Sequence, residues 1–282
     1  MFYEKVKSVY FSPTGNSKKV ADAIAKGLQA SIENVDLTSP KARLQKISEF
    51  HDELAIISSP VYVGRIPHEA AFRIRRLVAK NTPAILVVTY GNRAYEDALI
   101  ELNDIVSEVG FKPIAGCAFL AEHSFSTPEK PIAGGRPDKE DLDEAELFGR
   151  KIKEKLDKIG DAKNIIPAKM PGKNPYTLRA TLGIFEKPMS PYVDEEKCTK
   201  CGRCVDVCPV GAISIQDVVC NPSPRTLLTT RMVNVDPYTC VWCAACIRSC
   251  PANAFVRRPQ MIVTNERLNR NYPDRKKNET YL

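Results

Sequence analysis

The sequence predicts an α/β domain with a five-stranded parallel sheet, followed by a small α+β domain rich in cysteine. Two observations support this prediction. Across positions 1–160 apolar runs alternate with amphipathic helical patterns, which is typical of an open parallel sheet. Eight of the ten cysteines then fall in two short runs. We therefore divide the chain into a domain at 1–160, a linker at 161–191, a cysteine-rich domain at 192–259 and a basic C-terminal tail at 260–282.

The first domain is expected to contain five strands and five helices. The predicted strands are apolar, often β-branched runs at Lys5–Phe11, Ile32–Leu37, Leu54–Ser59, Ala84–Tyr90 and Pro113–Leu120. The predicted helices repeat apolar residues every three or four positions and span Ser17–Ala30, Lys41–Phe50, Pro67–Lys80, Ala94–Val109 and Asp138–Ile159. Such alternation predicts a doubly wound sheet, whose ligands bind at the carboxyl ends of the strands.

The linker is rich in proline, but it is too apolar for a free tether. We expect it to pack in places through Tyr176, Leu178, Leu182, Ile184 and Phe185. The tail after Pro259 is expected to be mobile or draped over a neighbour.

Charge and composition limit the class of protein. The N-terminus carries Glu4, Lys5 and Lys7 where a signal peptide would be apolar, and no run approaches the roughly 18 apolar residues of a membrane span. Cysteines packed into two runs, in a chain of 282 residues, do not suit a secreted disulfide scaffold. We therefore expect a cytoplasmic protein with no membrane span.

Each cysteine run reads C-x2-C-x2-C-x3-C-P. Structural zinc is normally held by two separated C-x2-C pairs, whereas three thiolates at this spacing suit three iron corners of a cubane. The fourth cysteine of such a run serves the other cluster, which explains why the motif occurs twice. Zinc or disulfides remain the alternatives. Cys220, between the two runs, is expected to be a bystander rather than a ligand.

Across positions 192–259 the two runs resemble those of bacterial ferredoxins with two 4Fe-4S clusters. The resemblance implies a ligand set for each cluster. Cluster I would be ligated by Cys198, Cys201, Cys204 and Cys250. Cluster II would be ligated by Cys240, Cys243, Cys246 and Cys208.

A polar, glycine-containing loop follows the first predicted strand, in the sequence SPTGNS at 12–17. Its hydroxyl and amide groups, with the free N–H groups of the following helix, suit a phosphate. Two more loops, SSPVYVGRIP at 58–67 and TYGNRAYEDAL at 89–99, end the third and fourth strands. All three therefore lie at the same edge of the sheet.

This trio of loops resembles the FMN-binding loops of flavodoxins, which implies a flavodoxin-like fold for residues 1–160. By that resemblance the phosphate would be held by Ser12, Thr14, Gly15, Asn16 and Ser17. The isoalloxazine would be enclosed by Pro60, Val61, Tyr62, Val63, Gly64, Tyr90, Gly91, Asn92, Arg93 and Tyr95. Tyr62 and Tyr95 would stack on the ring, with Arg93 as the alternative cover.

Histidine, cysteine and tryptophan offer further candidates for chemistry. His123 follows the last predicted strand, and we consider it both as a catalytic proton donor near the flavin and as a simple backbone partner. His51 and His68 are expected to be surface or capping residues, and Cys117 is expected in a buried strand. Trp242, inside the second cysteine run, is expected to shield cluster II from water.

The order of domains resembles fused flavodoxin–ferredoxin proteins of anaerobes. That resemblance implies electron transfer between two 4Fe-4S clusters, FMN and a redox protein partner. An FMN-dependent reductase of a small molecule is the alternative, and a homodimer is left open. The formal net charge is +7, but positions 1–160 carry as many cations as anions. Because anionic cofactors would offset most of the remaining charge, we do not expect nucleic-acid binding.

Overall fold

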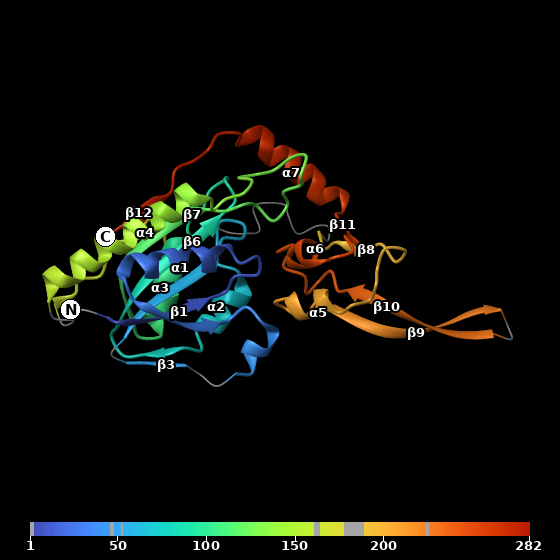
Figure 1. Ribbon diagram of the computed structural model, residues 1–282, viewed down its shortest axis with the longest axis horizontal. Coiled ribbons are helices and arrows are strands. Elements are labelled where there is room, and N and C mark those ends of the chain that lie inside the picture. The colour runs from blue at the N-terminus through green and yellow to red at the C-terminus, as the bar shows by residue number, and fades with distance from the viewer. Residues whose placement is uncertain (1–2, 46–47, 52, 161–163, 178–188, 224–225) are drawn as a thin grey trace.

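Five parallel strands form the body of the main sheet in the computed structural model (Figure 1). The structure describes residues 3–45, 48–51, 53–160, 164–177, 189–223 and 226–282. In spatial order the parallel strands are β2 (Ser31–Asp36), β1 (Lys5–Tyr10), β4 (Leu54–Pro60), β6 (Thr82–Tyr90) and β7 (Phe111–Leu120). The chain reverses direction across the sheet between β1 and β4, which is the switch point of a doubly wound fold. The predicted five-stranded parallel sheet is confirmed.

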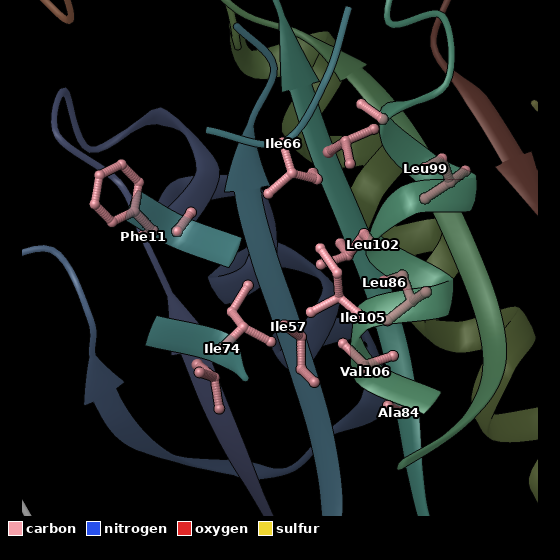
Figure 2. Close-up of a cluster of buried hydrophobic side chains, with 14 of the residues drawn as sticks. Phe11, Ile57, Ile66, Ile74, Ala84, Leu86, Leu99, Leu102, Ile105 and Val106 are labelled. Atoms are coloured by element: carbon pink, nitrogen blue, oxygen red, sulfur yellow. The ribbon is translucent and has the colours of Figure 1, made fainter. Parts of the chain in front are cut away.

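Helices cover both faces of this sheet. One face packs against α1 (Asn16–Leu28) and α4 (Lys139–Ile159), and the other against α2 (His68–Ile74) and α3 (Ala98–Glu108). Figure 2 shows Leu102 and Ile105 of α3 against Ile57 and Leu86 of the central strands. Because side chains alternate along a strand, Ile56 belongs to the opposite core while its neighbour Ile57 belongs to this one.

One predicted helix is wrong and another is too long. The described residues of Lys41–Phe50 form the end of the 3-10 turn η1 (Pro40–Arg43) and the short strand β3 (Glu49–Phe50) in place of an α-helix. Phe50 is buried edge-on against Phe111, with ring centroids 5.0 Å apart, and this favours an extended backbone. Helix α2 stops at Ile74 because Val78–Ala79 forms β5, which pairs with β3.

The second domain is built on the repeated cysteine motif. A two-stranded sheet joins β8 (Tyr192–Val193) to β11 (Phe255–Val256), and each motif contains one short helix, α5 (Arg203–Val207) or α6 (Ala245–Ser249). Between the motifs, β9 (Ile213–Ser223) and β10 (Thr226–Val235) form an antiparallel hairpin that extends away from the body (Figure 1).

The C-terminal segment differs from the mobile tail that we expected. It forms α7 (Pro259–Asn271) and then β12 (Glu279–Tyr281), which pairs antiparallel with β7 and makes the main sheet six-stranded (Figure 1). Asn278 fixes the junction: its carbonyl accepts from the N–H of Leu120 at 2.9 Å, and its amide donates to Asp141 and Glu144. The segment is therefore part of the first domain's sheet.

The first half of the linker packs as expected. Ile165 and Met170 are buried in the two cores, and the Tyr176 hydroxyl donates to Asp104 at 2.5 Å. Leu178, Leu182, Ile184 and Phe185 lie outside the described residues. Among the described residues, no helix is both long enough and apolar enough to cross a membrane.

Candidate functional site

A cavity of about 750 Å³ lies at the carboxyl ends of the central strands. Its floor comes from the three predicted loops and from residues 121–125, which follow β7. Its remaining walls come from far along the chain: residues 241–243 of the second cysteine run, and the face of α7 from Pro259 to Asn271. The volume lies within the range of ligand and cofactor sites. The C-terminal part of the chain therefore closes a site that the first domain opens.

The loop at 12–17 presents the N-terminus of α1 to this cavity. The N-cap residue Gly15 is left-handed, with a φ of 82°, and has no side chain that could cap the helix. Thr14 and Asn16 line the cavity, whereas Ser12, Gly15 and Ser17 do not. Ser12 instead holds the loop, because its hydroxyl accepts from the N–H of Lys18 at 3.2 Å. Ser17 shares a hydrogen bond of 2.7 Å with Thr89. The other first-turn N–H groups and the dipole of this helix end suit a phosphate.

The second loop turns sharply at Val63 and Gly64, whose φ values are 56° and 73°. Reciprocal backbone hydrogen bonds between Tyr62 and Arg65, at 2.9 and 3.2 Å, close this turn. Pro60, Val61, Tyr62 and Val63 line the cavity, and Gly64 does not. Burial raises the pKa of the Tyr62 phenol well above its ordinary value, and the charges of Cys243 and Cys240 add to this rise. Tyr62 therefore lies between the cavity and the second cysteine run.

The third loop is tied to the C-terminal segment. Tyr90, Gly91 and Arg93 line the cavity, while the buried Asn92 donates to the carbonyls of Tyr272 and Asp274 at 2.8 and 3.0 Å. Tyr95 does not line the cavity, so the structure does not place it where we expected it to stack on a flavin.

The Tyr95 hydroxyl is bonded to Tyr281 and Glu279, at 2.7 and 2.8 Å. Its ring packs edge-on against Tyr90. This residue therefore joins the third loop to β12.

His123 lies partly buried at the cavity wall. Its Nδ1 accepts a hydrogen bond from the N–H of Phe125 at 3.0 Å, so the neutral ring carries its proton on Nε2. Burial, with a contribution from the positive charges of Arg248 and Arg93, lowers the pKa of His123 to about 4. The imidazole is thus neutral at pH 7 and can donate a hydrogen bond, which differs from the proton donor that we considered.

Four cysteines from both motifs surround one small cavity. Cys208, Cys240, Cys243 and Cys246 all line it, with an enclosed volume of about 20 Å³. Burial raises the pKa of Cys240 to about 11 and that of Cys243 to about 12, and the charge of Cys208 contributes to each rise. Thiols gathered in this way need a cationic partner to be deprotonated together. The set fits cluster II, including its ligand from the first motif.

The predicted cluster I residues lie further out. Cys204 is buried, Cys198 and Cys250 are partly buried, and Cys201 is exposed. Cys204, Cys198 and Cys250 belong to one apolar core cluster with three of the cluster II thiols. The two fourth cysteines have equivalent surroundings: the Sγ of Cys208 accepts from the N–H four residues later at 3.2 Å, and that of Cys250 does so at 3.3 Å. The donor set suits a second cubane at the exposed end.

The zinc alternative finds no preformed site for a single ion. Among the residues that the structure describes, no three His, Cys, Asp or Glu side chains form a group that could hold one metal ion. Cys117 is buried in β7 as predicted, and the side chain of Cys220 lies outside the described part of the chain. The interpretation as cubanes therefore rests on the motif spacing and on the convergence of four thiols.

The second cysteine run contacts the first domain directly. Arg248, in α6, donates to the carbonyl of His123 at 3.0 Å and pairs with Glu122 at 3.3 Å. Arg257 donates to the carbonyl of Ser126 at 2.8 Å. These contacts hold the cluster II loop against the cavity wall, so the cavity and the four-thiol site share Val241 and Cys243.

Several lining residues were not predicted from the sequence. Trp242 and Met189 contribute apolar wall, and α7 contributes the polar residues Thr264, Arg267 and Asn271. Trp242 could have been found, because it lies between two predicted cluster ligands. No pattern in the sequence indicated that α7 would cover this cavity.

Comparisons with known proteins agree with this geometry. The family model described as flavodoxin matches residues 9–149, and the model described as a 4Fe-4S binding domain matches residues 191–214. No curated protein matches the sequence.

Among solved structures, a flavodoxin from the domain Archaea is 17% identical, with a TM-score of 0.35, over 54% of this chain and 99% of its own. Flavodoxin 1 from Bacillus cereus is 18% identical, with a TM-score of 0.35, over 53% and 97%. Rubredoxin oxygen:oxidoreductase from Desulfovibrio gigas is 13% identical, with a TM-score of 0.39, over 56% and 37%.

Proposed function

Because the chain belongs to the flavodoxin family over residues 9–149 and carries a 4Fe-4S binding domain at 191–214, we propose that it passes electrons between two 4Fe-4S clusters and one FMN. The two domain types support an electron-transfer role. The observation that favours an internal path is the wall shared by the large cavity and the four-thiol site, through Val241 and Cys243. Cluster II would thus lie next to the flavin.

The chain's own residues would bind and orient the flavin. The N-terminus of α1, with Thr14 and Asn16, would hold the phosphate. Trp242 and Val61 would contact the ring, and the Nε2–H of His123 would donate to one of its polar atoms. Helix α7 would exclude water from the side of the cavity that it lines. Bound there, FMN would exchange one or two electrons, whereas each cubane passes one at a time.

Cluster I is the proposed entry for a partner. Cys201 is exposed, whereas Cys208, Cys243 and Cys246 are each 7% exposed. Because the flavin cavity is covered by α7 and the cluster II loop, a redox protein would meet cluster I more readily than the ring. The order of transfer would be partner, cluster I, cluster II and FMN, or the reverse. We place the protein in the cytoplasm, because free cysteines and cubanes suit a reducing compartment.

Anaerobic purification with cofactor analysis tests this proposal. We expect about eight iron and eight sulfide per chain with one FMN, since each cubane holds four of each. Cys201→Ala should lose only cluster I and keep FMN, because ligation and folding of that loop are coupled. Zinc in place of iron, or a colourless protein that retains no flavin, would contradict the proposal.

A second candidate function is an FMN-dependent reductase of a small molecule. Two observations favour this second function: the size of the cavity and the exposed Arg267 on its α7 wall. This function requires turnover of a small acceptor, such as a quinone or nitro compound, by the purified protein with no partner protein. Reduction that depends strictly on a second redox protein would exclude it.

A further inference from the structure

Arg73 is a fully buried arginine to which the proposed function assigns no role. Its side chain is 1% exposed, although it extends from a surface helix, α2. Its Nε donates to Glu69 at 2.7 Å, and one terminal nitrogen donates to the carbonyls of Leu37, Thr38 and Ser39 at 2.5 to 2.8 Å. The other terminal nitrogen donates to the carbonyl of Pro209, which belongs to the second domain, at 2.6 Å.

That last contact reaches the four-thiol site. Pro209 directly follows Cys208, the one thiol of that site supplied by the first cysteine motif. The segment after Cys208 is tight, because the N–H of Gly211 donates to the Cys208 carbonyl and the N–H of Ala212 to its Sγ. A donor fixed on Pro209 therefore limits where the Cys208 thiol can lie.

The other end of the network reaches the phosphate loop. The Thr38 carbonyl accepts from Arg73 at 2.8 Å, while the Thr38 hydroxyl accepts from the N–H of Ser12 at 2.9 Å. Ser12 in turn accepts from the N–H of Lys18 in α1. Direct hydrogen bonds thus run from the first turn of α1, through Thr38 and Arg73, to the residue beside Cys208.

Arg73 is the buried cation of this network. Glu69 accepts from both Arg73 and Arg43, and a second carboxylate, Asp36, accepts from the N–H of Thr38 at 2.7 Å. Arg43 is half-exposed, at 55%, whereas Arg73 is screened from water. A buried cation interacts more strongly than an exposed one with a nearby charge, because little solvent screens it.

We infer that Arg73 is the positioning residue that joins the phosphate loop to cluster II and raises the reduction potential of that cluster. This inference rests on the proposed function. Its guanidinium fixes the Cys208–Pro209 segment against the first domain, and its charge stabilises the reduced cluster, which carries one more negative charge. Flavin binding and cluster II assembly should consequently favour each other, since coupling between sites is reciprocal.

The experiment compares Arg73→Gln with Arg43→Gln in the full-length protein prepared anaerobically. Midpoint potentials of both clusters are measured by electron paramagnetic resonance during redox titration. We expect Arg73→Gln to shift the potential of cluster II to a more negative value and to leave cluster I unchanged. Arg43→Gln removes the other cation that pairs with Glu69. Because Arg43 does not contact Pro209, this substitution should leave the midpoint potentials of both clusters unchanged. An unshifted cluster II in Arg73→Gln, or an equal shift in Arg43→Gln, would overturn the inference.

Arg73→Gln could fail to fold, since it leaves Glu69 and several carbonyls without a donor. Arg73→Lys then decides, because lysine keeps the charge but cannot bridge the loop at 37–39 and Pro209 together. We expect a chelator to remove iron from cluster II of this variant faster than in the wild type, with cluster I unchanged. Equal rates in both proteins would overturn the inference. A wild type that lacks iron or FMN would instead contradict the proposed function.

Discussion

The partly buried imidazole of His123 makes the free energy of unfolding depend on pH. Its pKa is lowered from 6.5 to about 4 in the folded protein, so the unfolded chain takes up a proton first as the pH falls. Stability is therefore lost as the pH falls from about 6.5 towards 4. At about 1.4 kcal/mol per pH unit, the full difference between the two pKa values amounts to roughly 3 kcal/mol. By pH 5.5 about 1.4 kcal/mol of this should already be lost.

His123→Gln removes this dependence, because glutamine does not titrate. We would measure anaerobic urea denaturation at pH 7.5 and 5.5 through the fluorescence of released flavin. The wild type should lose about 1.4 kcal/mol more than the variant between these two values. His51→Gln is the matched control, since His51 is exposed and should leave the wild-type behaviour unchanged. Equal losses in wild type and His123→Gln would refute a buried neutral His123.

The ligand assignment, the cavity wall and the C-terminal strand each lead to a further prediction. Cys208→Ala should remove only cluster II and Cys250→Ala only cluster I, as counted by spin quantitation of the reduced protein; loss of the same cluster in both variants would contradict swapped ligands. Trp242→Ala should raise the FMN dissociation constant roughly tenfold, or about 1.4 kcal/mol, in a fluorescence titration; unchanged affinity would remove Trp242 from the site. Asn278→Ala should speed amide exchange in β12 relative to β1, because it breaks the bonds to Leu120 and Asp141. Equal exchange in variant and wild type would show that strand pairing alone holds β12.

The centre of the parallel sheet could be predicted because strands β4 and β6 are buried on both faces. Strands β4 and β6 read as continuous apolar runs, and such runs need no knowledge of their neighbours. Lys41–Phe50 was misread for the opposite reason. Its few apolar residues fit a weak helical pattern, and only the packing of Phe50 against Phe111, which lies far along the chain, favours a strand. At Phe50, therefore, a contact with a residue far along the chain decides the backbone conformation, and the local sequence pattern does not.

The site could be predicted in part. The resemblance to two-cluster ferredoxins implied that Cys208, Cys240, Cys243 and Cys246 form one ligand set, and in the structure these four cysteines line one small cavity. The three loops that contribute to the floor of the large cavity were also predicted to lie together, since parallel strands present their ends at one edge. The neutral state of His123 was not predictable, because it depends on burial by the second domain and on Arg248.

The cover of the cavity shows what a sequence leaves undetermined. Met261, Asn265 and Leu268 are buried at four- and three-residue spacing, so the sequence of α7 does contain the pattern of a helix with one covered face. That pattern predicts a helix, but it does not predict which part of the protein the helix packs against. Polar contacts select the partner: the Asn265 amide donates to the carbonyls of Phe125 and Lys130, at 2.9 and 2.8 Å. Since both acceptors are backbone atoms, many sequences could offer them. The position of α7 over the proposed flavin site therefore follows only from the folded chain.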